Sequence, residues 1–304
     1  MSTLRIATRQ SKLALWQAEH VAARLKALYP TDTIELVPMT TQGDQLLNSP
    51  LSKIGGKGLF IKELEQVMLE GRADLAVHSM KDVGANLPEG FAIAAILERE
   101  NPYDAFVSSR YACLEDLPQG AKVGTCSLRR RMNLSALRPD LQLIDLRGNV
   151  QTRLQKLDDG EFDAIVLACA GLIRLGLKER IQQILPDTLS LPAVGQGAIG
   201  IECPINHPRF HDIVALNHEE TALCVKTERI ISHALQASCQ VPLSAFATLH
   251  DAHIRLRVRL GLPDGSRLID LDQSALRERA HDLGLELAQE LIARGADEIL
   301  RELA

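Results

Sequence analysis

The sequence predicts an α/β protein that contains two similar α/β lobes and a small C-terminal α+β domain. Three features of the pattern lead to this fold class. Short apolar strands alternate with amphipathic helices over roughly the first two thirds of the chain. Segments 98–102 and 191–197 interrupt that alternation with prolines. Beyond residue 236 the pattern changes to closely spaced strands followed by one long amphipathic helix.

The two interruptions also give the predicted domain boundaries. Two crossings between two α/β units are the layout of a hinged, two-lobed binding cleft. The 304 residues, of which 46% are hydrophobic, are enough for two or three separate cores. We therefore expect a first lobe of residues 1–98 plus 198–217, a second lobe of residues 103–192, and a C-terminal domain of residues 219–304.

Charge and composition exclude several classes of protein. The net charge of −5 argues against a general affinity for nucleic acid or for anionic membranes. No apolar run is long enough to cross a bilayer, and the first residues lack the pattern of a signal peptide. We therefore expect a cytoplasmic protein. The six cysteines include no C-x-x-C pair, so a zinc site is not expected. Disulfides are not expected in a cytoplasmic protein, and Cys169 should be a buried apolar residue.

The first lobe begins with a strand at Leu4–Thr8 and a helix from about residue 12 to 28, which Ser11 can cap. Arg9 lies beside the start of that helix, where backbone N–H groups favour an anion. The alternative, which is the more common case for an arginine without further context, is an ordinary surface residue. A strand at 34–38 follows.

Residues 40–57 form a long polar segment that carries Lys53 and Lys57 beside glycines. Loops of this length in a compact domain are usually lids or disordered segments. A cationic lid and a solvated loop are the two interpretations. The next helix should bury Phe60, Leu64 and Val67 on one face.

The segment from Asp74 to Val83 concentrates the most chemistry in the first lobe. Its first four residues predict a buried strand, and His78, Ser79, Lys81 and Asp82 then lie at or just past the strand's carboxyl end. In an open α/β sheet that end faces the ligand crevice. The alternative is a polar loop after a strand.

In the second lobe, polar residues again follow predicted strands, and most of them are arginines. Its polar residues follow successive strands or begin the next helices: Thr125, Ser127, Arg129, Arg130, Arg147, Arg153 and Arg174. Arginines in such positions suit forked binding of carboxylates or phosphates. The alternative is a solvated helix face. The placement at equivalent ends of successive strands favours a site.

The C-terminal domain should contain strands at 243–250, 253–262 and 267–271, then helices at about 274–293 and 296–303. Cys239 precedes the first of these strands, among small and polar residues. Of the six cysteines it is the best candidate for an accessible thiol.

Seven short motifs together resemble one family, porphobilinogen deaminase, also called hydroxymethylbilane synthase. Each motif is short, but their order and spacing in one chain are highly specific, and they span nearly the whole sequence. They are Leu4-Arg-Ile-Ala-Thr-Arg9, Gly55-Gly-Lys-Gly-Leu-Phe60, His78-Ser-Met-Lys-Asp82, Ser127-Leu-Arg-Arg130, Leu146-Arg-Gly-Asn149, Pro192-Ala-Val-Gly-Gln-Gly197 and Cys239-Gln-Val-Pro242.

The resemblance implies a transferase of haem and sirohaem biosynthesis. A dipyrromethane cofactor would be bound by a thioether to Cys239, and Asp82 would be the catalytic carboxylate. Porphobilinogen units would be joined head to tail onto the cofactor, each losing ammonia. The linear tetrapyrrole hydroxymethylbilane would then be released by hydrolysis. No metal is implied. The protein is expected to act as a monomer and to pass its product to a uroporphyrinogen-III synthase.

The resemblance also implies three sets of binding residues. The cofactor's carboxylates would meet Lys81, Thr125, Ser127, Arg129, Arg130 and the Gly171 backbone. The substrate would meet Arg9, Ser11, Ser79, Arg147, Arg153, Arg174 and Gln196. Lys53, Lys57 and Phe60 would belong to the lid or its hinge.

The chain departs from the usual family pattern beside three of these motifs and at one further position. Ala237 and Ser238 replace two glycines before Cys239, and Gly84 replaces a proline after the motif that contains Asp82. Cys126 replaces a serine and Gln42 an arginine. None of these changes removes a residue with a chemical role.

Two other functions fit parts of the sequence. A non-catalytic, two-lobed small-anion-binding protein would have similar lobes, since these resemble periplasmic binding proteins. Such a protein would need neither Cys239 nor a third domain, and would usually carry a secretion signal. A nucleic-acid binder could use Arg129–Arg131, but an acidic chain with 3% aromatic residues is poorly suited to that role.

Overall fold

The structure is a computed structural model of the 304-residue chain, and it describes residues 3–41, 61–237 and 240–303. The proposed lid residues Lys53, Lys57 and Phe60 lie outside the described residues. So does Cys239, the proposed cofactor anchor.

The chain forms two compact units, each with most of its residue contacts inside itself. Unit 1 comprises Met1–Glu100 and Ala198–Ala222, and unit 2 comprises Asn101–Gly197 and Leu223–Ala304. The chain thus passes between the units at about residues 100 and 197, inside or next to the two proline-containing segments, and a third time between Ala222 and Leu223. The further division of unit 2 into a second lobe and a C-terminal domain stays a prediction, although its strands form two separate sheets.

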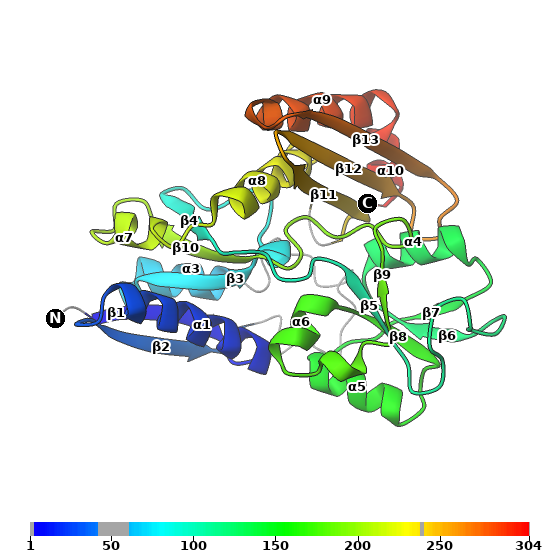
Figure 1. Ribbon diagram of the computed structural model, residues 1–304, viewed down its shortest axis with the longest axis horizontal. Coiled ribbons are helices and arrows are strands. Elements are labelled where there is room, and N and C mark those ends of the chain that lie inside the picture. Colours follow the sequence, from blue (N-terminus) through cyan, green and yellow to red (C-terminus); the bar gives the residue numbers. More distant parts are fainter. Residues whose placement is uncertain (1–2, 42–60, 238–239, 304) are drawn as a thin grey trace. The chain divides into compact units, whose positions relative to one another are not determined.

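Unit 1 contains a five-stranded mixed sheet in the order β2-β1-β3-β10-β4 (Figure 1). β1, β2 and β3 are parallel, whereas β10 runs antiparallel to both of its neighbours. β10 returns from far along the sequence to lie between β3 and β4, within the segment 198–217 that was predicted to belong to the first lobe. The strands are β1 (Thr3–Arg9), β2 (Thr33–Met39), β3 (Leu75–Ser79), β4 (Phe91–Ile96) and β10 (Ile199–Pro204).

Helices cover both faces of this sheet. α1 (Lys12–Leu28) buries Val21 and Leu25 among sheet residues that include Ile6. α3 (Lys62–Leu69) buries Leu64 in a second cluster with Ala7, the next residue of β1. Neighbouring residues of a strand point to opposite faces, so each helix packs on its own side of the sheet. α7 (Phe210–Val214) packs beside β4 and β10.

A buried contact between His78 and Glu202 lies in the middle of the unit 1 sheet, where β3 and β10 pair. His78 Nε2 lies 2.8 Å from Glu202 Oε2, with the side chains only 5% and 0% exposed. His78 is therefore inside β3 and buried, whereas the sequence placed it among the residues facing a crevice. The sequence could not show its partner, which lies 124 residues further along the chain.

His78 and Glu202 also act electrostatically on Glu65 of α3. Burial and then the negative charge of Glu202 raise the pKa of Glu65 from its usual 4.5 to about 7, while His78 and Lys62 oppose that shift. The folded unit therefore holds a proton on Glu65 at pH values where an unfolded chain has lost it.

Unit 2 begins with a second five-stranded mixed sheet, in the order β7-β6-β8-β5-β9. β6, β7 and β8 are parallel, and β5 runs antiparallel between β8 and β9. The sequence did not predict β9. The strands are β5 (Asp104–Val107), β6 (Lys122–Gly124), β7 (Gln142–Ile144), β8 (Ala164–Ala168) and β9 (Gln183–Leu185).

Each face of this second sheet also has its own core. Ile165 of β8 packs in a cluster with Leu154 of α5 (Val150–Asp158) and Leu172 of α6 (Cys169–Arg174). Val166, the next residue, packs in a cluster with Leu134 of α4 (Leu128–Leu137). Cys169 is fully buried, as the sequence predicted.

The rest of unit 2 contains a three-stranded antiparallel sheet, β11-β12-β13, which shares one core with three helices (Figure 1). The elements are β11 (Leu243–His250), β12 (His253–Gly261), β13 (Leu268–Leu276), α8 (Glu219–Ala234), α9 (Ala280–Ala293) and α10 (Ala296–Glu302). The prediction of a helix from residue 274 was wrong, because β13 pairs with β12 as far as Leu276. Two lobes and a small α+β region are thus confirmed as the fold class.

The turn between β12 and β13 packs directly on α4. Gly265 has φ of 75°, and a Cβ built there would lie 2.5 Å from the backbone nitrogen of Ala136. Arg259 of β12 also donates to Asn133 Oδ1 of α4 at 2.8 Å. The three-stranded sheet therefore supports this helix at two points.

Among the residues that the structure describes, no helix is both long and apolar enough to cross a membrane. Their five cysteines are free thiols, and Cys169, Cys203 and Cys224 are buried.

The state of Glu65 gives a pH-dependent prediction. Because the folded-state pKa is raised, the stabilising contribution of Glu65 should be fully present below about pH 4.5 and should be lost as the pH rises through about 7. The full shift would correspond to about 3 kcal/mol, which solvent screening of this half-exposed group reduces to about 1 kcal/mol. Glu65→Gln should therefore raise the melting temperature at pH 8 and change it little at pH 5. The exposed Glu19→Gln is the control, and an equal effect of Glu65→Gln at both pH values would contradict the prediction.

The turn at Gly265 gives a second prediction. Gly265→Ala should destabilise the protein by about 2–5 kcal/mol, the sum of a left-handed residue with a Cβ and an overpacked contact. Gly160→Ala is the matched control, because Gly160 has φ of 79° but nothing within 4 Å of the added Cβ. It should cost only about 1–2 kcal/mol. Thermal unfolding of both variants measures the difference, and equal costs would show that the contact with α4 is unimportant.

Candidate active site

Asp82 lies in a short turn that is held in place by the buried Met80. β3 ends at Ser79, and the 3₁₀ turn Met80–Asp82 follows. The Met80 side chain is 1% exposed and fills the space over Gly200, where an added Cβ would meet its sulfur. The Met80 N–H also donates to the Ala198 carbonyl at 3.0 Å. Lys81 and Asp82 are half-buried, so both side chains of this fixed turn remain partly accessible to solvent.

Arg9, Ser11 and Ser79 lie at the same edge of the unit 1 sheet. β1 and β3 are parallel neighbours, so their carboxyl ends, at Arg9 and Ser79, lie at one edge. Ser11 caps α1 by accepting a hydrogen bond from the Ala14 N–H at 3.3 Å. Ser79 Oγ accepts a hydrogen bond from Gln17 Nε2 of α1 at 2.9 Å. The structure thus brings these three residues to the sheet edge that the sequence predicted.

In unit 2, two hydroxyl groups shape the start of α4. Ser127 is its N-cap and accepts a hydrogen bond from the Arg130 N–H at 3.4 Å. Thr125 Oγ1 accepts from the Ser127 N–H at 3.2 Å. These bonds turn the chain from β6 into α4, so that Arg129 and Arg130 begin the helix at the carboxyl edge of the sheet.

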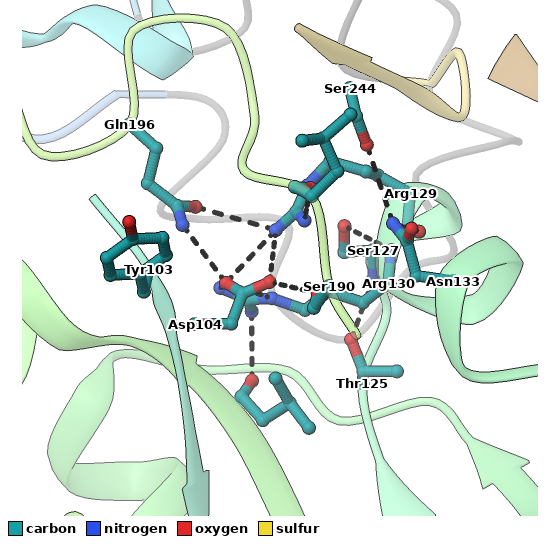
Figure 2. Close-up of polar contacts among 12 residues, drawn as sticks. Tyr103, Asp104, Thr125, Ser127, Arg129, Arg130, Asn133, Ser190, Gln196 and Ser244 are labelled. Carbon is teal, nitrogen blue, oxygen red and sulfur yellow. Dashed lines mark hydrogen bonds and ion pairs between the residues drawn. The ribbon is translucent and has the colours of Figure 1, made fainter. Parts of the chain in front are cut away.

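Arg129 and Arg130 both bind one buried carboxylate, that of Asp104 (Figure 2). Arg129 Nη2 lies 2.8 Å from Oδ2 and 3.1 Å from Oδ1. Arg130 donates to Oδ1 from Nε at 3.0 Å and from Nη2 at 2.8 Å. Ser190 Oγ donates to Oδ2 at 2.7 Å, and Gln196 Nε2 donates to Oδ1 at 3.1 Å.

The direction of β5 explains how Asp104 reaches these arginines. β5 is antiparallel to β8, and Asp104, its first residue, pairs with Ala168, the last residue of β8. The beginning of β5 therefore lies where the parallel strands end. An acidic side chain at that position meets the helix starts that carry the arginines.

Asp104 is ionised. Burial opposes its charge, but the guanidinium groups of Arg129 and Arg130 outweigh that effect and hold its pKa well below the usual range. Burial lowers the pKa of Arg129, and Asp104 counteracts this shift. The cluster thus contains two cations and one anion in a site that is almost closed to solvent.

The buried arginines also bind main-chain oxygens. Arg129 Nη1 donates to the Leu191 carbonyl at 2.6 Å, and Arg130 Nη1 to the Val166 carbonyl at 2.9 Å. Arg174 Nη2 donates to the Gly197 carbonyl at 2.7 Å. These three arginines are buried, so the alternative interpretation of a solvated helix face does not apply to them. It better describes Arg131, which pairs with the exposed Asp145.

The remaining predicted residues of unit 2 lie near the carboxyl ends of β7 and β8. Arg147 is half-buried, just beyond β7. Arg153 of α5 donates from Nε to the Gly148 carbonyl at 2.7 Å. Gly171 is buried in α6, directly after β8.

Asp104 is the functional-site residue that the sequence did not reveal. It is not among the candidate residues of the sequence analysis. One signal was present, because an acid that begins a wholly buried strand needs countercharges. The partners lie 25 and 26 residues further along the chain, which no local pattern connects.

Comparisons with known proteins identify the family. Residues 4–212 match the family model "Porphobilinogen deaminase, dipyromethane cofactor binding domain", and residues 222–293 match "Porphobilinogen deaminase, C-terminal domain". The chain is 61% identical over 302 residues to the porphobilinogen deaminase of Dichelobacter nodosus, covering 99% of both chains.

Solved structures of low sequence identity are also similar. The methionine-binding protein MetQ is 14% identical with a TM-score of 0.45, over 70% of this chain and 89% of that one. A periplasmic substrate-binding protein of an ABC transporter from Coxiella burnetii is 14% identical with a TM-score of 0.43, over 72% of this chain and 94% of that one. The assignment does not depend on these two structures.

The family models and the full-length relative confirm the resemblance that the seven motifs predicted. With it they confirm an enzyme of tetrapyrrole biosynthesis that uses a dipyrromethane cofactor. The chain belongs to the porphobilinogen deaminase family.

Proposed function

We propose that this enzyme deaminates porphobilinogen and joins the units head to tail on a dipyrromethane cofactor, then releases hydroxymethylbilane by hydrolysis. The observation that best supports this chemistry is the buried pair Arg129–Arg130 at the carboxyl edge of a sheet. Pyrroles of this class carry acetate and propionate groups, and paired guanidiniums bind carboxylates through charge-assisted, forked hydrogen bonds.

The residues of the arginine cluster fit the proposed cofactor. Two guanidiniums and one carboxylate leave a net charge of about +1, which suits an acidic ligand. When bound, the cofactor supplies the pyrrole carbon to which the chain is joined. We propose that its carboxylates are held by Lys81, Thr125, Ser127, Arg129, Arg130 and the Gly171 backbone, and that Cys239 forms the thioether.

Asp82 is the proposed catalytic carboxylate. Loss of ammonia from porphobilinogen leaves a cationic pyrrole fragment, and a carboxylate placed where that charge develops stabilises it. The same group can accept or return a proton during addition. The anchored turn at Met80 supports this role, because it holds Asp82 in place and leaves the side chain half-exposed.

Substrate binding is assigned to residues at the carboxyl edges of both sheets. Their arginines would pair with the acetate and propionate groups, and their hydroxyl and amide groups would add hydrogen bonds. The proposed set is Arg9, Ser11, Ser79, Arg147, Arg153, Arg174 and Gln196. Lys53, Lys57 and Phe60 are proposed to act as a lid or its hinge.

The cellular setting is also a proposal. We propose a monomer that works in the cytoplasm and hands its linear product to a uroporphyrinogen-III synthase. Free thiols at all five described cysteines are typical of a reducing compartment. The net charge of −5 gives no general attraction to nucleic acid.

The proposed anchor makes a prediction about mass. The chain purified from cells that make tetrapyrroles should weigh one dipyrromethane more than its sequence, and Cys239→Ser should abolish that adduct. Cys126→Ser is the control and should keep it. Intact-protein mass spectrometry measures all three proteins. An adduct that persists in Cys239→Ser but disappears in Cys126→Ser would move the anchor to Cys126.

The proposed catalytic group makes a prediction about turnover. Asp82→Asn should slow porphobilinogen consumption by about 10²–10³-fold or more, because it removes the charge that stabilises the cation. The cofactor adduct and the melting temperature should stay close to wild type. Consumption is followed by the loss of porphobilinogen, with the exposed Glu89→Gln as the control. Consumption near the wild-type rate would remove Asp82 from this role.

A further inference from the structure

Asp104 sits at the centre of the contacts drawn in Figure 2, yet it has no part in the proposed chemistry. We infer that Asp104 is a positioning residue, which fixes the guanidinium groups of Arg129 and Arg130 before an acidic ligand arrives. This inference rests on the proposed function, since it takes these two arginines to bind the cofactor's carboxylates.

The contacts hold each arginine from two sides. Arg130 donates to Asp104 from Nε and Nη2, and its third nitrogen, Nη1, donates to the Val166 carbonyl of β8. Arg129 donates to Asp104 from Nη2 and to the Leu191 carbonyl from Nη1. A planar group that is held at two edges can no longer rotate. Its remaining N–H groups then point in fixed directions.

The carboxylate itself is also fixed. Its Oδ2 accepts from Ser190, and its Oδ1 accepts from Gln196, which also donates to the Pro102 carbonyl at 2.7 Å. Asp104 is 0% exposed, so solvent does not compete for these bonds. Ligand binding then requires little reordering of the side chains, which is the main energetic advantage of a preorganised site.

A simpler role for Asp104 would be to neutralise charge, and the two roles predict opposite results. With Asp104 the cluster carries a net charge of about +1, and without it about +2. If Asp104 only neutralises charge, its removal should strengthen the attraction for an acidic ligand. If it positions the arginines, its removal should impair ligand capture despite the greater charge.

The experiment follows cofactor assembly on the full-length chain. The protein is purified without cofactor from cells that cannot make porphobilinogen. It is then incubated with porphobilinogen, and intact-protein mass spectrometry measures the fraction that carries the adduct over time. Asp104→Asn should slow the appearance of the adduct by about 10-fold or more. Asp104→Glu keeps the charge but moves the carboxylate, and it should be slowed as well.

Asp140→Asn is the matched control. Asp140 pairs with Arg138, which caps the far end of α4, at 2.7 Å. This variant breaks an Asp–Arg pair beside the same helix and should load at the wild-type rate. Melting temperatures of the cofactor-free proteins show whether loading simply follows stability.

Each outcome decides the question. Wild-type loading by a folded Asp104→Asn, or faster loading, would overturn the positioning role, and so would normal loading by Asp104→Glu. If the wild-type chain itself never gains the adduct, the proposed function fails instead. If Asp104→Asn does not fold, Ser190→Ala decides, because it removes one bond to the carboxylate and touches neither arginine. It should load about 3-fold more slowly, and unchanged loading would overturn the inference.

Discussion

The second unit depends on one buried interaction, that of Asp104 with Arg129 and Arg130. Two neighbouring guanidiniums could not be buried together without a countercharge, because the desolvation of each costs several kcal/mol. The countercharge is available because β5 runs against its parallel neighbour and so begins where β8 ends. The polarity of a single strand therefore determines whether a carboxylate-binding pair of arginines can exist at this edge.

In unit 1 an antiparallel strand also begins beside the end of a parallel strand. This strand is β10, and its Ile199 pairs with Ser79 of β3. Here the beginning of the strand supplies a main-chain carbonyl for the Met80 N–H, and Gly200 provides the space for the Met80 side chain. One unit thus fixes a turn that presents Asp82, and the other fixes two cations. Both depend on an antiparallel strand that enters an otherwise parallel edge.

Much of the fold could be predicted from local patterns. The apolar stripe of α1 gave its bounds correctly, and Ser11 is its N-cap, as side-chain chemistry predicted. What could not be predicted depends on partners far away in the sequence. Asp104 looked like an ordinary strand residue, and the burial of His78 depends on Glu202 in a strand more than a hundred residues later. β13 continued beyond the predicted boundary because pairing with β12 outweighed the local helical pattern.

The contact between the three-stranded sheet and α4 changes how the C-terminal region should be regarded. Asn133 donates to the Arg129 carbonyl at 2.8 Å and accepts from Arg259 of β12 at 2.8 Å. The backbone of the arginine-bearing helix is thus tied to a sheet formed more than a hundred residues later in the chain. During synthesis, that helix would leave the ribosome before its support exists. The start of α4, with Arg129 and Arg130, would therefore gain this support only after β12 has been made.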